Sequence, residues 1–116
     1  MAFEASCQCG KVVCKVDADI PTSVFECNCS RCRRLGFLLA FVPRDSFTLV
    51  QGDDVLKSYF FHKHVIEHRF CTECGVQPFA LGNMPDGSPM AGINMRCVET
   101  VDLDALERQK VDGASR

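Results

Sequence analysis

The sequence predicts a small all-β domain, and three observations support this fold class. Short runs rich in Val and Phe recur along the chain, each bounded by Gly, Pro, Asn or Asp, as strands separated by turns are. Helical periodicity is nearly absent. Most of the nine cysteines fall into three tight groups, which is typical of a domain built around bound metal. With 116 residues, the chain is expected to form one domain, residues 1–116, of short antiparallel strands.

The expected strands follow one another at short intervals. The pattern predicts them at Lys11–Asp17, Ser23–Cys27, Phe37–Pro43, Ser46–Gln51, Leu56–His62, Val65–Cys71, Gln77–Leu81 and Ala91–Cys97. The stretch FFHKHVIEHRF predicts a hairpin that turns near Lys63, and the Pro and Gly of NMPDGSP indicate a loop. One short helical turn is expected at Leu103–Leu106, with Asp102 as its N-cap.

Composition and charge exclude several classes of protein. The chain is 47% hydrophobic and 24% charged, as soluble globular domains are, and its net charge is -2. Nucleic acids and anionic membranes both require a basic surface, so neither is an expected partner. No apolar run approaches the ~20 residues of a membrane span, and the first ten residues lack the apolar core of a secretory signal. We therefore expect a cytoplasmic protein, with no signal in the sequence for its oligomeric state.

The high density of cysteine points to bound metal. In a secreted protein, nine cysteines would suggest disulfides. Here no secretory signal is seen and the count is odd, so metal-bound thiolates are preferred over disulfides and over free thiols that fill the core. A set of thiolate ligands favours zinc, although it also suits iron.

Two of the cysteine groups predict a closed structural zinc site. Both sulfurs of a C-x-x-C turn can lie ~2.3 Å from one zinc, and the two residues of C-x-C on an extended segment face the same side. Gly10 and Gly75 follow the first and third groups, where a positive φ would turn backbone N–H groups toward the sulfurs. The ligands of this predicted site are Cys7, Cys9, Cys71 and Cys74.

The central group CNCSRC predicts a second site with three ligands, which are Cys27, Cys29 and Cys32. Three protein ligands and an open fourth position are how catalytic zinc is held, so we expect water or a substrate atom in the fourth place. A fourth protein ligand would instead make this a second structural site. The available side chains are Cys14, Cys97, His62, His64 and His68. Both spare cysteines lie in strand-like sequence that favours a core position.

These motifs, in this order, resemble those of the glutathione-dependent formaldehyde-activating enzyme family. The resemblance covers about residues 5–112 and includes SCQCGKVVCKV, CNCSRCRRLG and HRFCTECGVQPFALG. The later PDGSPMAGINMRC and VDLDALERQKVDG are similar to the branch that contains the C-terminal domain of centromere protein V. The resemblance implies a tent-like all-β fold around two zinc ions, the four-cysteine site structural and the three-cysteine site catalytic.

The activity implied by this resemblance is the condensation of glutathione with formaldehyde to S-(hydroxymethyl)glutathione, the reverse of a carbon–sulfur lyase reaction. Glutathione carries two carboxylates, and guanidinium groups bind carboxylates through paired hydrogen bonds. Arg31, Arg33 and Arg34 cluster around Cys32, and Arg33 is expected to contact glutathione. The alternative is a solvated basic turn that only offsets the thiolate charge.

Two other functions remain open at this point. The chain could act as a lyase on another thiol and electrophile, because fold and zinc sites do not determine the substrate. It could also be a non-enzymatic zinc module that binds a protein partner. An enzyme needs the fourth position of the three-cysteine site open, whereas a scaffold would close it with Cys14, Cys97 or a histidine.

Overall fold

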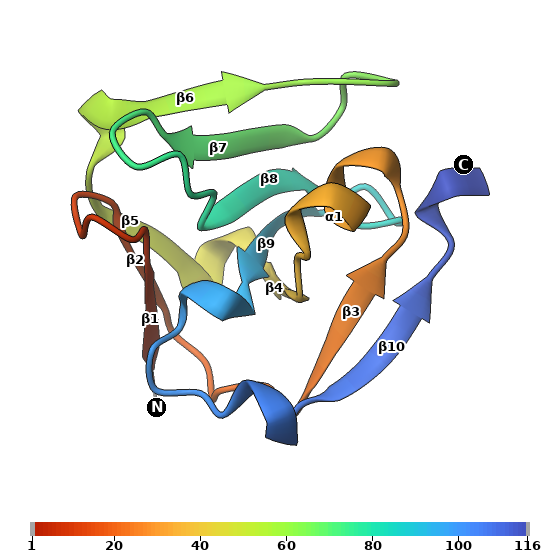
Figure 1. Cartoon of the computed structure of the whole chain (residues 1–116), viewed down its shortest axis with the longest axis horizontal. Helices are drawn as coiled ribbons and strands as arrows, with labels where there is room; N and C mark the ends of the chain where they lie inside the picture. Colours follow the sequence, from red (N-terminus) through yellow and green to blue (C-terminus); the bar gives the residue numbers. More distant parts are fainter. Residues whose placement is uncertain (1, 116) are drawn as a thin grey trace.

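The computed structural model describes residues 2–115 and confirms the all-β fold class (Figure 1). One short helix, α1 (Ser30–Leu35), accompanies ten strands and several 3-10 turns within these residues. No helix in this part of the chain is long and apolar enough to cross a membrane. The strands are β1 (Phe3–Ser6), β2 (Val13–Val16), β3 (Ser23–Cys27), β4 (Leu39–Pro43), β5 (Phe47–Gln51), β6 (Leu56–Tyr59), β7 (Glu67–Cys71), β8 (Phe79–Asn83), β9 (Pro89–Asn94) and β10 (Glu107–Val111).

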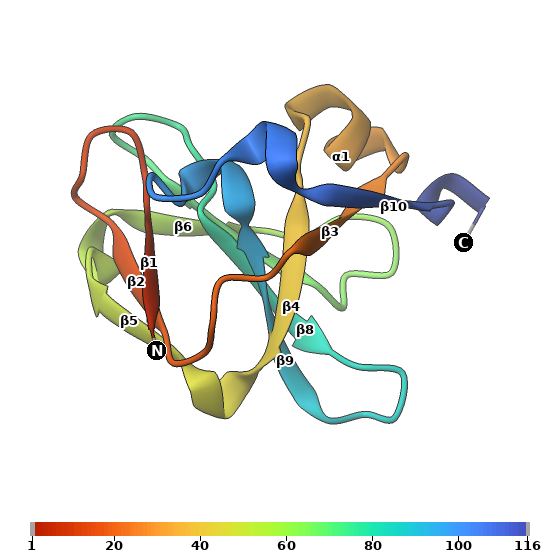
Figure 2. The same cartoon turned by 90° about the horizontal axis from the view of Figure 1, so that it is seen from below.

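The strands form two sheets. The smaller has the order β1-β2-β5, and the larger has the order β10-β3-β4-β9-β8-β7-β6. Neighbouring strands pair antiparallel, as expected, except that β10 pairs parallel with β3. Figures 1 and 2 both show these two strands side by side, leading toward α1 and the C-terminus. The last strand therefore brings the end of the chain beside the turn that follows β3.

The eight expected strands are all present, with ends shifted by a few residues. Strands β1 and β10 were not predicted, because β1 (FEAS) has a single large apolar side chain and the sequence ERQKV of β10 is mostly exposed and polar. The expected strand Ala91–Cys97 ends at Asn94, after which Met95–Cys97 forms a 3-10 turn. The helical turn is present at Leu103–Ala105, and the Asp102 side chain caps it as predicted.

Helix α1 was also missed, because six residues are too few to show a period. The Cys29 sulfur accepts a hydrogen bond from the Cys32 N–H at the start of α1. Gly36 ends the helix at a φ of 72°, and its N–H bonds to the Cys32 carbonyl. Backbone groups at both ends of the helix thus form hydrogen bonds with nearby residues. At the first end, the partner is a cysteine of the central group.

The core lies where the two sheets meet. Its buried side chains come from the small sheet, such as Phe3 and Val16, and from the large sheet, such as Val24 and Ile93. The rings of Phe47 and Phe79 connect the two sheets, with their centroids 4.8 Å apart. Full burial of one such aromatic side chain contributes about 1.5–3 kcal/mol.

Strands β6 and β7 form the predicted hairpin at the edge of the large sheet. The turn around Lys63 is closed by a hydrogen bond of 2.9 Å from the His64 N–H to the Phe61 carbonyl. His62 and His64 adopt positive φ values of 56° and 57° in this turn. The pairing places Tyr59 of β6 opposite His68 of β7.

Candidate metal centres and the adjoining groove

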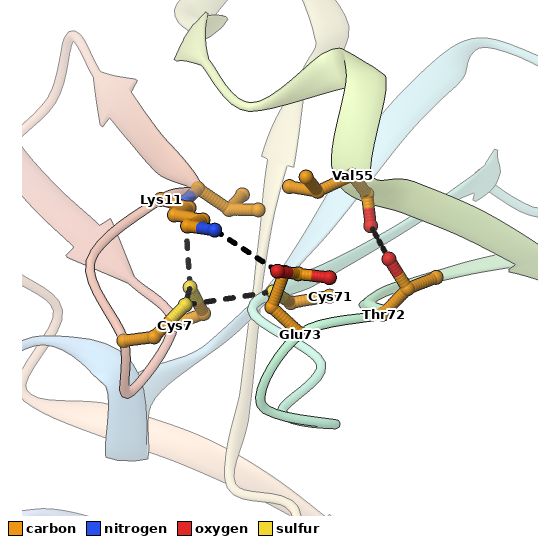
Figure 3. Close-up of polar contacts among 8 residues, drawn as sticks. Cys7, Lys11, Val55, Cys71, Thr72 and Glu73 are labelled. Atoms are coloured by element: carbon orange, nitrogen blue, oxygen red, sulfur yellow. Dashed lines mark hydrogen bonds and ion pairs between the residues drawn. The ribbon is translucent and has the colours of Figure 1, made fainter.

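Four cysteine sulfurs from two distant loops gather at one end of the small sheet. Figure 3 labels one cysteine from each loop, Cys7 and Cys71. They are Cys7, Cys9, Cys71 and Cys74, the group predicted from the sequence. All four sulfurs lie within 4.8 Å of one another, with 3.5 Å between Cys7 and Cys9 and 3.7 Å between Cys9 and Cys71. A tetrahedral site with ~2.3 Å zinc–sulfur bonds places its sulfurs about 3.8 Å apart. The donor set and its spacing therefore fit zinc.

The backbone around this cluster is shaped by the two glycines. Gly10 and Gly75 have φ values of 81° and 80°, which confirms the predicted turns. Their N–H groups bond to the carbonyls of Cys7 and Cys71 at 3.2 and 2.8 Å. The Val12 N–H donates to the Cys7 sulfur at 3.3 Å. An N–H group that donates to a sulfur stabilises a thiolate and so prepares its loop to hold a cation.

An ion pair also spans the two loops. The Lys11 Nζ lies 2.9 Å from a Glu73 carboxylate oxygen, and Figure 3 shows this pair beside the sulfurs. Next to it, the Thr72 hydroxyl donates to the Val55 carbonyl at 2.8 Å. Both contacts hold the turn after β7 in place.

The three cysteines of the central group also come together. They are Cys27, at the end of β3, Cys29, at the N-cap of α1, and Cys32, inside the helix. Backbone N–H groups point at two of the sulfurs, from residue 29 to Cys27 at 3.4 Å and from residue 32 to Cys29 at 3.3 Å. Burial opposes ionisation of Cys29, but the N–H groups facing it leave the pKa of this thiol lowered. Three converging thiols, two of them supported in this way, form a set that suits zinc.

The candidate fourth ligands lie elsewhere. Cys14 and Cys97 belong to the hydrophobic core, and burial raises the pKa of each thiol to about 12. His62 and His64 are exposed in the β6–β7 turn. His68 is buried against Gln77. Among residues 2–115, the metal-type grouping at the central site has three members and no fourth.

The C-terminal segment forms a wall of this three-cysteine site, which the sequence did not predict. A Cβ atom on Gly113 would lie 2.4 Å from the Cys27 sulfur. Asn28 holds the segment there, since its side-chain amide donates to Asp112 at 3.1 Å and accepts from the Ala114 N–H at 2.9 Å. Only the parallel pairing of β10 with β3 brings these residues together.

An open groove of about 430 Å³ lies along α1, against β6 and the chain just after it. Its lining residues are Ser30, Arg31, Arg34, Leu35, Tyr59 and Phe61. Arg33, the predicted glutathione contact, is exposed and does not line this groove. A second hollow, of about 540 Å³, lies over β1 and β2 and includes none of the clustered cysteines.

The sequence shows Arg31 as one of the arginines around Cys32, but it does not predict which residues contact Arg31. Its guanidinium donates to the Gln77 side chain and lies over the Tyr59 ring. Gln77 and Tyr59 are 46 and 28 positions away, and neither belongs to one of the three cysteine groups. Only folding reveals that they surround this arginine.

Fold and clusters together define a class, that of small all-β proteins with two cysteine clusters that could hold metal ions. The sequence model of the family described as glutathione-dependent formaldehyde-activating enzyme matches residues 2–110, and the chain belongs to this family. A crystal structure of a Rhodobacter sphaeroides protein, a structural genomics target, is similar with a TM-score of 0.78 and 25% sequence identity. The match covers 92% of this chain and 100% of the other. The likeness to the centromere-protein branch stays a prediction.

Proposed function

We propose that this protein condenses glutathione with formaldehyde at the site formed by Cys27, Cys29 and Cys32, as a carbon–sulfur lyase acting in the direction of synthesis. The observation that carries this proposal is the contrast between the two cysteine groups. One has four members and forms a closed set, whereas the other has three members among residues 2–115. Membership of the family supports glutathione and formaldehyde as the substrates.

The proposal includes two zinc ions per chain. The four-cysteine set would hold a structural ion, and the three-cysteine set would hold a catalytic ion and leave one position for the substrate. When bound there, zinc supplies the charge that keeps a coordinated thiol deprotonated at neutral pH, where a free thiol with a pKa of ~8.5 is mostly protonated.

The reaction itself needs little from the protein besides orientation. The thiolate sulfur bonds to the carbon of formaldehyde, the π electrons move to oxygen, and a proton completes the hydroxyl group. The proton equals the one lost by the thiol, so the product contains every atom of both reactants and no oxidant is required. The N–H groups of residues 29 and 32 offset the charge of the cysteine thiolates.

The arginines of α1 are the proposed contacts of the glutathione carboxylates. Arg31 and Arg34 line the groove, and Arg33, on the same helix, stays a predicted contact. Each would use the charge of a guanidinium to orient a substrate whose sulfur reaches the cysteine site. A cytoplasmic location, where glutathione is available, completes the proposal.

Native mass spectrometry of the full chain tests this function. We expect two zinc ions per chain and a glutathione adduct that is lost in Cys29→Ser, together with formaldehyde consumption that needs glutathione. The matched control is Cys97→Ala, a cysteine outside both clusters, which should keep both the adduct and the activity.

Two results would contradict the proposal in different ways. Two zinc ions without a glutathione adduct, but with an adduct of another thiol, would favour a lyase with another substrate. Two zinc ions without any thiol adduct would favour a non-enzymatic zinc module.

A further inference from the structure

Arg31 is held in place from two directions. Its Nη2 and Nε atoms donate to the Gln77 Oε1 at 2.6 and 3.2 Å, and its guanidinium carbon lies 4.8 Å from the centre of the Tyr59 ring. The hydrogen bonds fix the plane of the group and the aromatic ring covers one face. The side chain is therefore ordered before any ligand arrives.

The partner that orients Arg31 is neutral. Gln77 is only 5% exposed, and its Nε2 lies 3.1 Å from the His68 Nδ1. Because the Gln77 oxygen accepts from Arg31, its amide nitrogen donates to His68, whose Nδ1 must be the unprotonated nitrogen of a neutral ring. The guanidinium group of Arg31 is thus oriented by Gln77, which His68 holds in place, and both of these side chains are uncharged.

No carboxylate balances this charge. The described arginine and lysine side chains that form ion pairs are Lys11, Arg69, Arg108 and Lys110. Arg31 is not among them. Among residues 2–115, no acidic group lies within ion-pair distance of Arg31. A structural arginine that is half-buried normally has an acidic partner, since removing a charge from water is costly. The remaining N–H groups of Arg31 are available to an anion from solution.

A closed ring of contacts keeps this arrangement rigid. The Tyr59 ring stacks on Phe61 with centroids 5.9 Å apart, and Phe61 stacks on His68 at 5.2 Å. The contacts run from Arg31 through Gln77, His68, Phe61 and Tyr59 and return to Arg31. They connect α1 with the β6–β7 hairpin and the loop before β8. We call these five residues the Arg31 ring.

Arg34 adds a second positive charge on the same face of the helix. It follows Arg31 by three positions, lines the same groove, and donates from Nη1 to the Ser30 carbonyl at 2.8 Å. Leu35, Tyr59 and Phe61 supply the apolar part of the groove. Two guanidinium groups beside an apolar wall suit a small acid with a short carbon chain.

We propose that the Arg31 ring is a carboxylate-binding site that makes the enzyme select thiols bearing a carboxylate over uncharged thiols. Arg31 is the specificity-determining residue, and Gln77 is a positioning residue that orients it without neutralising it. The helix connects this site to the chemistry, because Arg31 lies between Cys29 and Cys32. The inference rests on the proposed function in so far as a thiol substrate reaches the three-cysteine site.

S-methylglutathione separates the two proposals, because it has both carboxylates of glutathione but no thiol. Binding to the zinc-loaded full chain is measured by calorimetry. We expect Arg31→Gln to weaken binding about ten- to a hundredfold, the range for losing hydrogen bonds to a charged group. The control Arg44→Gln removes an exposed arginine outside the groove and should leave binding unchanged. Equal affinity of wild type and Arg31→Gln would overturn the inference, as would a loss that appears in Arg33→Gln instead.

Gln77→Glu distinguishes binding from architecture. A purely structural role predicts that Glu would pair with Arg31 and retain or raise the melting temperature without affecting the ligand. The proposed role predicts that this carboxylate neutralises Arg31 and weakens S-methylglutathione binding at least tenfold, while metal content stays at the wild-type level. Unchanged binding by a folded Gln77→Glu variant would contradict the role of Gln77.

Turnover gives the second readout. With glutathione, Arg31→Gln should raise KM more than it lowers kcat, and the preference for glutathione over 2-mercaptoethanol should fall by the same ten- to hundredfold. If formaldehyde condensation occurs with an unchanged preference, the carboxylate site is wrong and the proposed condensation reaction at the three-cysteine site stands. If S-methylglutathione binding depends on Arg31 but no thiol reacts with formaldehyde, the proposed function is wrong and the carboxylate site stands.

Discussion

Gly113 lies directly against Cys27, so that a Cβ atom on the glycine would be 2.4 Å from the cysteine sulfur and 3.3 Å from the Cys29 Cβ. The C-terminal segment is thereby part of the three-cysteine site. Asn28, between the two cysteines, binds the same segment through its side chain, and its N–H donates to the Val111 carbonyl at 3.1 Å. The wall is built from residues that the sequence separates by more than eighty positions.

Gly113→Ala should therefore loosen the central site. The added methyl group cannot fit at 2.4 Å, so either the segment leaves Cys27 or the sulfur moves. In both cases we expect a chelator to remove one of two zinc ions several times faster than from wild type, measured with a colorimetric zinc indicator. The neighbouring exposed variant Ala114→Ser is the control and should match wild type. Release of zinc from Gly113→Ala at the wild-type rate would show that the wall does not protect the site.

Loss of a cysteine ligand should affect folding in the four-cysteine cluster but not in the three-cysteine cluster. The four-cysteine set connects loops that are 62 residues apart, and structural zinc contributes roughly 10–16 kcal/mol in small peptides. A domain of this size is stable by only about 5–15 kcal/mol. We expect Cys74→Ser to lose most of its cooperative thermal unfolding, followed by circular dichroism, and Cys29→Ser to stay folded with one zinc ion. Equal melting temperatures for the two variants would show that the sites do not differ in this way.

Acid should destabilise the protein partly through His68. Burial, and then the positive charge of Arg31, lower the pKa of His68 to about 4, against ~6.5 in an unfolded chain. Between these values the unfolded state binds the proton and the folded state does not, so the contribution is complete above pH 6.5 and is lost as the pH falls toward 4. Over this pH range, the free energy of unfolding decreases by about 3 kcal/mol through His68.

His68→Asn isolates this contribution, because it retains an acceptor near the former Nδ1 but does not titrate. Unfolding in urea between pH 7.5 and pH 5 measures both proteins, and zinc loss from the thiolates affects both alike. We expect a steeper decline for the wild type. Parallel curves would mean that His68 does not control the acid sensitivity.

The Lys11–Glu73 ion pair should contribute little, although it crosses the four-cysteine site. Its side chains are 55% and 48% exposed, and ion pairs in such positions contribute little to stability because water and salt screen them. Glu73→Gln should shift the melting temperature by only a few degrees and leave the zinc content at two. A loss comparable to that of Cys74→Ser would show that the pair is needed to close the loops.

Much of the fold was visible in the sequence because strands with one buried face leave a local pattern. The turn around Lys63 and the cap at Asp102 were predicted from residue types within a few positions. Strand β10 gave no such signal, since its ERQKV sequence lies at the edge of the larger sheet and is mostly exposed. Its parallel pairing with β3 depends on a long return of the chain, which local sequence does not encode.

The sequence by itself determined the composition of the candidate metal centres. The spacing of C-x-C and C-x-x-C restricts which sulfurs can converge, and the structure brings together the same groups of four and three. Only the tertiary structure decided what surrounds them. The Gly113 wall and the Gln77 partner of Arg31 come from distant segments that the strand order places together. Ligand spacing is a local property of the backbone, whereas the shape and charge of a site arise from packing between segments.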